Sequence, residues 1–536
     1  MRKAYISAVL LVLALLVYVM LPDRRDDGAN SLGNGTVHGR RQHKSSHDDE
    51  TNAEKHSASE NKFAAHRLPG DYPNATAAVQ ISSSALGDSL AAKARELGIS
   101  VRWIPALRII MLHGRDDAVR RLLADAAFKD FEVEYNIQLR MIPEKESHNI
   151  IGPSGRPFLD SHLEWLGIDS KQESRGKGVK IAILDTAIDL SSISSANITT
   201  FDLFGLEREP GSHGTMVASI IVGEADRIEG IANGASILSI PVMDSEGNGY
   251  VFNLAEAIVA AADAGVDIIS MSVTCQYESS VLRSAVEYAL SKGCVLVAAA
   301  GNEGVSADGM STVGYPAAFD GVISVGAVNA DGARAGFSST GEELALMAPG
   351  VGIIADNGDG YALFSGTSAA APLAAGTIAY VKGKIDGTAT HAATLLLELA
   401  NDAGMPGPDD EYGLGNINAE RALNYDMEGY NDFAAADIVS KTDEDGHSAV
   451  YFSAQNRGND DLATAELLCI LHLSDGETCT KTMKFQDVKQ NQTVSVKIDL
   501  PEGVTALYAE MTATSPSDDS VKANNYMEKI LFTRMP

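Results

Sequence analysis

The chain has 536 residues, of which 45% are hydrophobic and 21% charged, so it is long enough to form several folded domains. Its 72 acidic and 42 basic residues give a formal net charge of −30 at pH 7. A surface of that sign repels nucleic acid and anionic lipid, which argues against a nucleic-acid-binding function. Four cysteines are too few for a disulfide-based scaffold.

Residues 1–22 begin with the basic stretch MRK and continue with eighteen uncharged, mostly apolar residues. At about 1.5 Å per residue, this run comes close to the length that spans a bilayer. Two interpretations remain open, an uncleaved membrane anchor and a cleaved signal sequence. The lack of a small-residue cleavage site favours the anchor. Because the basic start stays inside, both interpretations predict export of the rest of the chain, either membrane-anchored in the periplasm or extracellular space, or secreted.

Residues 23–75 are polar and low in complexity, which predicts a disordered tether. Its histidines include His38, His43, His47 and His56, which offer weak metal ligands. A solvated spacer accounts for the same composition, and we prefer that interpretation.

Residues 76–145 have the pattern of a small α+β unit. The pattern predicts a strand over 101–114, a helix with an apolar stripe over 115–131, and a second strand over 132–143. The stretch GPSGRP at 152–157 then predicts an exposed linker.

From 156 to 425, apolar runs alternate with helical stretches such as 253–265 and 280–293. The apolar runs cover 178–185, 235–243, 266–273, 294–302 and 321–328. Continuous apolar strands separated by helices predict an α/β domain with a doubly wound, mostly parallel sheet. In such sheets, ligands bind beyond the carboxyl ends of the strands, and polar residues follow the runs here.

Residues 430–536 contain short alternating runs separated by turn residues, which predict an all-β sandwich of antiparallel strands. Cys469 and Cys479 flank the turn-like stretch LSDGE. A disulfide across this hairpin and two free thiols both remain open, because the register of the strands decides between them.

Three segments of the α/β region carry side chains suited to nucleophilic catalysis. Asp185 ends an apolar strand in KIAILDTAID, His213 opens an apolar helix in GSHGTMVASIIVG, and Ser368 opens another in FSGTSAAAPLAAG. A serine hydroxyl needs an adjacent base, imidazole serves near neutral pH, and a carboxylate orients the imidazole. Free N–H groups at a helix start stabilise an oxyanion, and the amide of Asn302 in VAAAGNEG could donate to it too. Each residue taken alone could instead have a structural role, such as capping a helix.

In this order, DTAID, HGTMVAS, AAAGNEG and GTSAAAP resemble the motifs of the subtilisin-like serine proteases, and the resemblance extends over nearly all of 156–425. It implies that Ser368 is the nucleophile, that His213 is the general base and then acid, and that Asp185 holds the imidazole. It also implies that Asn302 and the Ser368 N–H form the oxyanion hole. The chain contains no G-x-S-x-G elbow, which argues against an α/β-hydrolase.

The resemblance further implies that substrate adds as a strand between two edge segments, here Gly247–Val251 and Ser272–Thr274. Ala299–Gly301 would form the S1 wall. The implied substrate-binding residues are Gly247, Gly249, Tyr250, Ser272, Val273, Thr274, Ala299, Ala300 and Gly301. Thr274 and Cys275 stand where the family usually has glycines, so we expect their side chains to narrow or reshape the S1 entrance.

The flanking regions also resemble known modules. Residues 76–145 resemble the family's propeptide, with cleavage expected between about 142 and 156, and the C-terminal region resembles an Ig-like adhesion-type repeat of bacterial secreted proteins. The family's calcium loop is shortened at 222–235, so no metal or other cofactor is expected, although a structural calcium cannot be read from the sequence. Cys275 and Cys294 are expected at opposite ends of adjacent strands, too far apart to bridge.

The sequence therefore predicts an exported serine endopeptidase made as a zymogen. Its expected partners are a protein or peptide substrate, its own propeptide, and the membrane through residues 1–22. The alternative is an inactive relative that binds peptides or scaffolds a complex.

Overall fold

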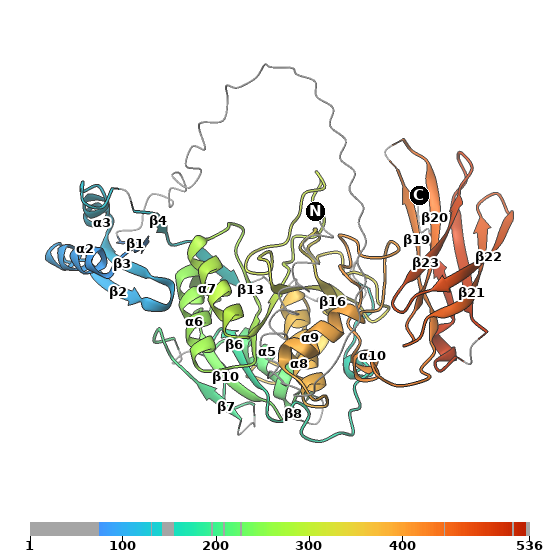
Figure 1. Cartoon of the computed structure of the whole chain (residues 1–536), viewed down its shortest axis with the longest axis horizontal. Coiled ribbons are helices and arrows are strands. Elements are labelled where there is room, and N and C mark those ends of the chain that lie inside the picture. The colour runs from blue at the N-terminus through green and yellow to red at the C-terminus, as the bar shows by residue number, and fades with distance from the viewer. Residues whose placement is uncertain are drawn as a thin grey trace, which may run out of the picture.

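The chain is described by a computed structural model, in which an N-terminal, a central and a C-terminal unit follow one another (Figure 1). The described residues are 74–129, 131–141, 155–193, 197–206, 210–225, 228–443, 445–516 and 519–531. The predicted anchor or signal at 1–22 and nearly all of the predicted tether at 23–75 lie outside them. Within the described ranges, none of the helices combines the length and apolar character needed to cross a bilayer.

The N-terminal unit is an antiparallel four-stranded sheet of order β2-β3-β1-β4 with helices α2 and α3 on one face. Its elements are β1 (Asn74–Gln80), α2 (Ser84–Glu96), β2 (Ser100–Ile104), the short helix η1 (Pro105–Leu107), β3 (Ile109–Arg115), α3 (Asp116–Leu123), β4 (Val133–Tyr135) and β5 (Gln138–Met141). Because successive side chains of a strand point to opposite faces, Ala77 and Val79 pack under these helices while Ala78 packs against the central unit.

Both strands predicted in this unit are divided in two. The strand expected over 101–114 is interrupted by η1, where Pro105 fixes the backbone and Arg108 adopts a left-handed conformation with φ 54°. The strand expected over 132–143 separates into β4, which belongs to the N-terminal sheet, and β5, which pairs with two segments of the central unit. Partner strands rather than the local pattern decide where a strand pairs, so the pattern alone could not predict this division.

The central unit contains a seven-stranded sheet of order β16-β15-β14-β12-β6-β10-β7, in which every neighbouring pair is parallel. Its strands are β6 (Lys180–Asp185), β7 (Ile198–Thr200), β10 (Ser236–Pro241), β12 (Ile268–Met271), β14 (Val295–Ala299), β15 (Val322–Val328) and β16 (Leu346–Pro349). The predicted α/β fold with a mostly parallel, doubly wound sheet is confirmed.

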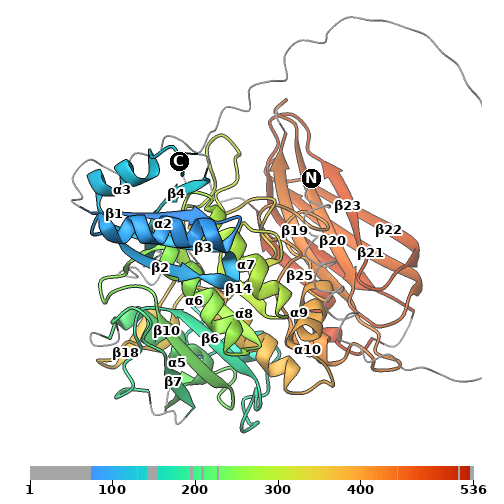
Figure 2. The same ribbon diagram turned by 60° about the vertical axis from the view of Figure 1, so that its left-hand side comes forward.

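Helices cover both faces of this sheet, as the two views show (Figures 1 and 2). Ile181 and Ile183 of β6 share one core with α5 (Ser212–Val222), α8 (Thr367–Lys382) and α9 (Ala389–Glu398). Ala182 and Leu184 share the other core with α6 (Val251–Asp263) and α7 (Ser280–Ser291). The shorter elements are α4 (His162–Trp165), β8 (Glu224–Ala225), β9 (Ile228–Glu229), β11 (Asn248–Tyr250), β13 (Val273–Thr274), β17 (Ile353–Asp356), β18 (Tyr361–Phe364) and α10 (Ala419–Leu423).

The C-terminal unit consists of two antiparallel sheets that enclose one apolar core. The three-stranded sheet contains β19 (Phe433–Thr442), β20 (Ser448–Asn456) and β23 (Thr493–Asp499). The four-stranded sheet contains β22 (Thr478–Val488), β21 (Leu462–Leu473), β24 (Ala506–Thr514) and β25 (Tyr526–Ile530), and the short helix η2 (Lys522–Asn524) precedes β25. The predicted all-β character of this region is confirmed.

The four cysteines are free thiols. In the β21–β22 pair, Cys479 lies opposite Leu471 and Cys469 lies opposite Lys481, so the two cysteines are offset by two residues along the hairpin. The sequence left open whether Cys469 and Cys479 form a disulfide, and in the structure they do not. Cys275 and Cys294 are not bridged to each other either.

Candidate active site

Asp185 and His213 are brought together where β6 ends and α5 begins. The buried Asp185 carboxylate accepts hydrogen bonds through Oδ1 from His213 Nδ1 at 2.7 Å and from the Thr186 backbone N–H at 2.7 Å. Since Nδ1 carries the proton in this contact, Nε2 of the ring is left as the proton acceptor. The pair therefore has the geometry of a carboxylate that orients a catalytic base.

The turn after β6 holds the first turn of α5 in place. Thr186 Oγ1 accepts a hydrogen bond from the Gly214 N–H at 2.9 Å, and the Ala187 carbonyl accepts one from the Gly211 N–H at 2.8 Å. A Cβ added to Gly214 would lie 2.2 Å from the Thr186 carbonyl oxygen, so glycine is required at this close approach. These contacts fix the His213 ring relative to Asp185.

Ser368 is the second residue of α8 and is 1% exposed. Its Oγ makes no hydrogen bond within the part of the chain that the structure describes. Helices α5 and α8 pack against each other, and the ring of Phe364, four residues before Ser368, meets the His213 ring edge-on at 5.4 Å. The segment that leads into Ser368 therefore lies against the His213 ring.

A proline inside α8 links Ser368 to the neighbouring strand end. Pro372 has no N–H, so the carbonyl of Ser368, four residues earlier, lacks its helical partner. Ser272 Oγ donates to that carbonyl at 2.9 Å. Because Ser272 lies between β12 and β13, the nucleophile segment is tied directly to a predicted substrate-binding segment.

Asn302 faces the same helix start. Its Oδ1 accepts hydrogen bonds from Thr367 N–H at 3.0 Å and Thr367 Oγ1 at 3.1 Å, which turns Nδ2 toward Gly366. Gly366 has φ 145°, and a Cβ built there would lie 3.0 Å from Asn302 Nδ2 and 3.6 Å from Ser368 N. Two N–H donors thus border one small space, which is the arrangement that stabilises an oxyanion.

Strand β5 of the N-terminal unit occupies the space between the two predicted edge segments. It pairs antiparallel with β11 through Gly249↔Leu139 and with β13 through Val273↔Met141. Leu139 is fully buried in this position. The chain direction carries β5 past Thr274 and Val273 toward Ser272, and so toward Ser368.

Several predicted substrate-binding residues have other contacts. Gly247 lies in the turn before β11, with φ 80°, and Asn248, Gly249 and Tyr250 make the pairing instead. Ala299 and Ala300 are fully buried in the core that contains α8. Gly301 donates its N–H to Thr367 Oγ1 at 3.2 Å.

The two residues expected to line the S1 entrance point in different directions. Thr274 is half-buried, and its Oγ1 would lie only 2.0 Å from a Cβ built on Gly314. Cys275 is 5% exposed, and its thiol donates to the Tyr277 carbonyl at 3.4 Å. Burial raises the pKa of the Cys275 thiol to about 12. The expectation for Cys275 was wrong because successive side chains alternate along a strand, which turns this one into the core.

The sequence analysis did not predict the pairing of β5 with the edge segments, and it did not single out Gly314 or Pro372. Gly314 and Pro372 carried a local signal, since a glycine allows a close backbone approach and a proline within a helix leaves a carbonyl free. For β5 the signal was absent, because its role depends on strands more than 100 residues further along the chain.

Comparisons with known proteins agree with this architecture. The model of the "Subtilase family" peptidases matches residues 176–415. Subtilisin DY of Bacillus licheniformis is 36% identical over 259 residues, which are 47% of this chain and 93% of that protein. Subtilisin E of Bacillus subtilis (strain 168) is 40% identical over 274 residues, which are 50% of this chain and 71% of that protein.

The crystal structure of fervidolysin from Fervidobacterium pennivorans, described as a keratinolytic enzyme related to subtilisin, superimposes with a TM-score of 0.57 at 21% identity. The match covers 87% of this chain and 77% of fervidolysin, and at this identity it shows a shared fold. The identity of 36% and 40% to the two subtilisins is high enough to show the family as well as the fold. The chain belongs to the subtilase family of serine peptidases.

Proposed function

We propose that the chain is an exported serine endopeptidase that is made as a zymogen and hydrolyses peptide bonds through Asp185, His213 and Ser368. The observation that carries the proposal is the seating of β5 between β11 and β13, in the position that an extended peptide substrate would take. Its direction toward Ser272 and Ser368 supports the assignment of the reacting centre.

The chemistry follows from the contacts of the three side chains. The Ser368 hydroxyl attacks the peptide carbonyl while His213 Nε2 takes its proton, and Asp185 stabilises the resulting imidazolium through the 2.7 Å contact. The negative oxygen of the tetrahedral intermediate accepts from Asn302 Nδ2 and the Ser368 N–H. The imidazolium then protonates the leaving amine, and water hydrolyses the acyl-enzyme by the reverse sequence of proton transfers.

The zymogen proposal rests on the N-terminal unit. Its strand β5 fills the space between β11 and β13, so substrate enters only after this segment leaves, and the polypeptide between about 142 and 156 is the expected region of cleavage. Export rests on the apolar run in residues 1–22, either as a membrane anchor or as a signal sequence. For the C-terminal unit, an Ig-like role in positioning the enzyme remains part of the proposal.

Labelling with a fluorophosphonate tests the catalytic assignment. Wild-type protein should label once the N-terminal unit has been cleaved, and Ser368→Ala should abolish both labelling and peptide hydrolysis. N-terminal sequencing of both proteins should show that Ser368→Ala also prevents cleavage between 142 and 156. A cleaved wild-type chain that fails to label would instead support the inactive, peptide-binding alternative.

Thr274 is proposed to restrict the S1 site, because its side chain lies against Gly314. In Thr274→Gly, kcat/KM for substrates with a large P1 side chain should rise about tenfold relative to those with a small one, since one or two methyl-sized groups in a pocket have effects of that order. A peptide library with varied P1 measures the ratio. Thr274→Ser should give an intermediate value, and a wild-type enzyme that already prefers large P1 residues would contradict the assignment.

A further inference from the structure

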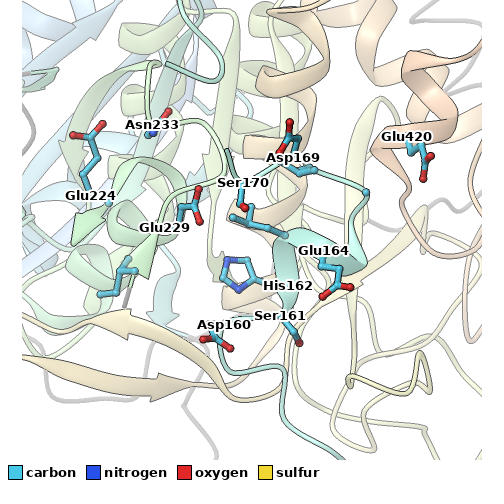
Figure 3. Close-up of a pocket in the computed structure, with 15 residues that line it drawn as sticks. Asp160, Ser161, His162, Glu164, Asp169, Ser170, Glu224, Glu229, Asn233 and Glu420 are labelled. Carbon is cyan, nitrogen blue, oxygen red and sulfur yellow. The ribbon is translucent and has the colours of Figure 1, made fainter. Parts of the chain in front are cut away.

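An open cavity of about 1000 Å³ lies at the end of α5 that is remote from His213. Figure 3 shows the ring of His162 near its centre, with the side chains of Asp160, Glu164 and Glu229 around it. The wall is formed by α4, the segment 167–170, residues of strands β8 and β9, and Glu420 at the start of α10. Nothing in the proposed peptidase mechanism uses these groups.

The rim of this cavity is strongly acidic. Its carboxylates belong to Asp160, Glu164, Asp169, Glu224, Glu229 and Glu420, and all six residues are exposed. In the described part of the chain, the single lysine or arginine within ion-pair distance of these carboxylates is Arg175, which contacts Glu229 Oε1 at 2.9 Å. A concave surface of one sign concentrates the field and attracts ligands of opposite charge.

Arg175 stiffens the wall and is itself unable to enter the cavity. Its side chain is completely buried, and it donates to the carbonyls of Ser170, Gln172, Gly230 and Ile231 at 2.7–3.1 Å. These bonds join the loop before β6 to the segment after β9. The acidic rim is therefore held on a fixed frame.

The floor carries a buried imidazole without a hydrogen-bond partner of normal geometry. His162 is 5% exposed, and the backbone of Leu159 and Glu229, which lies near the ring and raises its pKa slightly against the effect of burial, makes no hydrogen bond of normal length and angle with it. Burial lowers the pKa of His162 to about 4, so the ring is neutral near pH 7 and offers one donor and one acceptor. Buried polar groups without partners are uncommon because each costs about 1–3 kcal/mol, which suggests that something from solvent binds here.

A metal ion does not suit this donor set. No three His, Cys, Asp or Glu side chains of the described residues come close enough together to hold one. The carboxylates are instead spread around a space far larger than an ion needs and within the size range of organic-ligand sites. An extended organic cation can reach several of them at once and can donate an N–H to the neutral ring.

We propose that this cavity binds an organic cation that carries alkylammonium groups, with His162 at the floor and Asp160 and Glu164 at the rim. The ammonium can come from lysine side chains of a polypeptide or from a free polyamine. The site is independent of the proposed peptidase function, since it lies at the opposite end of α5 from His213.

Calorimetric titration at pH 7 tests the site on the full chain carrying Ser368→Ala, which prevents self-digestion. The probes are trilysine, trilysine with acetylated side chains, and spermidine. Trilysine or spermidine should bind saturably and more weakly as salt is raised, whereas the acetylated peptide should not bind. Preference for trilysine would identify a polypeptide as the source of the cation, and preference for spermidine would identify a polyamine.

Variants distinguish specific binding in this cavity from non-specific electrostatic attraction of a cation to an acidic protein. Glu164→Gln should weaken binding about 2–5-fold, as expected for one exposed carboxylate, and Asp160→Asn combined with it should weaken binding further. His162→Phe should weaken binding although it leaves the charge unchanged. The matched control is Glu502→Gln, an exposed carboxylate in a turn of the C-terminal unit. The proposal fails if neither probe saturates, if Glu164→Gln and Glu502→Gln bind alike, or if Ca²⁺ displaces the probe with 1:1 stoichiometry.

Discussion

The central unit is joined to its two neighbours in different ways. The N-terminal unit is attached through apolar side chains of β1, η1 and β3 that share a core with α6 and α7, and through polar contacts at the edges of secondary structure. These polar contacts are the β5 pairing, the Arg102–Glu256 ion pair at 2.6 Å, and bonds to the free N–H groups at two helix starts. Asn136 Oδ1 accepts from the Phe252 N–H of α6 at 3.1 Å, and Glu134 Oε2 accepts from the Ser280 N–H of α7 at 2.9 Å. After release, water can satisfy all of these groups, so this joint can open without leaving a buried polar atom unpaired.

The C-terminal sandwich is attached through buried charged and polar side chains. Arg421 of α10 is 4% exposed, and it donates to the carbonyls of Leu399 and Ala400 and to Asn491 Oδ1 of the sandwich. Gln455 of β20 accepts from the Asp402 N–H at 3.0 Å. Burial lowers the pKa of Arg421 to about 9 and raises the pKa of Asp402, which shows how far water is excluded. The joint that is proposed to open and the joint to the sandwich thus differ in their chemistry.

The largest effect on stability should come from Arg421→Ala, which removes the buried contacts between the central unit and the C-terminal sandwich. The substitution leaves several carbonyls and Asn491 without a donor in a buried position, which costs about 3–5 kcal/mol in the free energy of unfolding. Urea unfolding of the Ser368→Ala chain measures the change.

The matched control for this experiment is Arg283→Ala. Arg283 lies on α7, has a side chain 39% exposed, and pairs with Glu278 at 2.7 Å. An exposed pair of this kind contributes less than about 1 kcal/mol. If the two substitutions cost the same, the buried contacts of Arg421 do not hold the sandwich, and the contrast between the joints disappears.

The sequence singled out the proposed catalytic side chains because they occupy recognisable local positions. Asp185 and Asn302 follow apolar strands, and His213 and Ser368 begin buried helices, so parallel-sheet geometry alone brings them to one edge. The alternating and continuous apolar runs likewise predicted the all-β and α/β regions.

The joints and the acidic cavity could not be predicted in this way. Arg175, Arg421 and His162 lie in irregular segments or short helices, where a polar residue normally indicates the surface, yet all three are buried. Their burial depends on carbonyls and carboxylates contributed by distant parts of the chain. The division of 132–143 into β4 and β5 escaped prediction for the same reason.

Acid should weaken the central unit itself, independently of either joint, through His162. Its pKa is about 4 in the folded protein and about 6.5 in an unfolded chain, so between these values the unfolded state binds the extra proton. Stability is therefore complete above pH 6.5 and falls as the pH decreases, by up to about 3 kcal/mol at pH 4. The difference in unfolding free energy between pH 7 and pH 4.5 should shrink in His162→Gln. His447→Gln serves as the control because the side chain of His447 is 81% exposed, and an equal change in both variants would contradict the assignment.

The smallest effect should come from weakening the contact between the N-terminal unit and the start of α7. Glu134 Oε2 accepts hydrogen bonds from Ser280 N–H, Ser280 Oγ and, at 3.3 Å, Val281 N–H, and its charge lies at the positive end of α7. Loss of these charge-assisted bonds in Glu134→Ala should favour opening by about 1–2 kcal/mol. Amide hydrogens shared between β5 and β11 would then exchange about 5–30-fold faster in the intact Ser368→Ala chain.

Glu132→Ala is the matched control for this loosening, because Glu132 is an exposed neighbour whose backbone carbonyl, retained in the variant, bonds to Gln80. Its exchange rates should match those of the parent. Faster exchange in both variants would mean that the N-terminal sheet itself has loosened, whereas unchanged exchange in Glu134→Ala would place the strength of the joint in the strand pairing and the apolar contacts of Ala78 and Met111. Faster exchange confined to Glu134→Ala would establish that the start of α7 holds the N-terminal unit through groups that water can replace, as the proposed release of this unit requires.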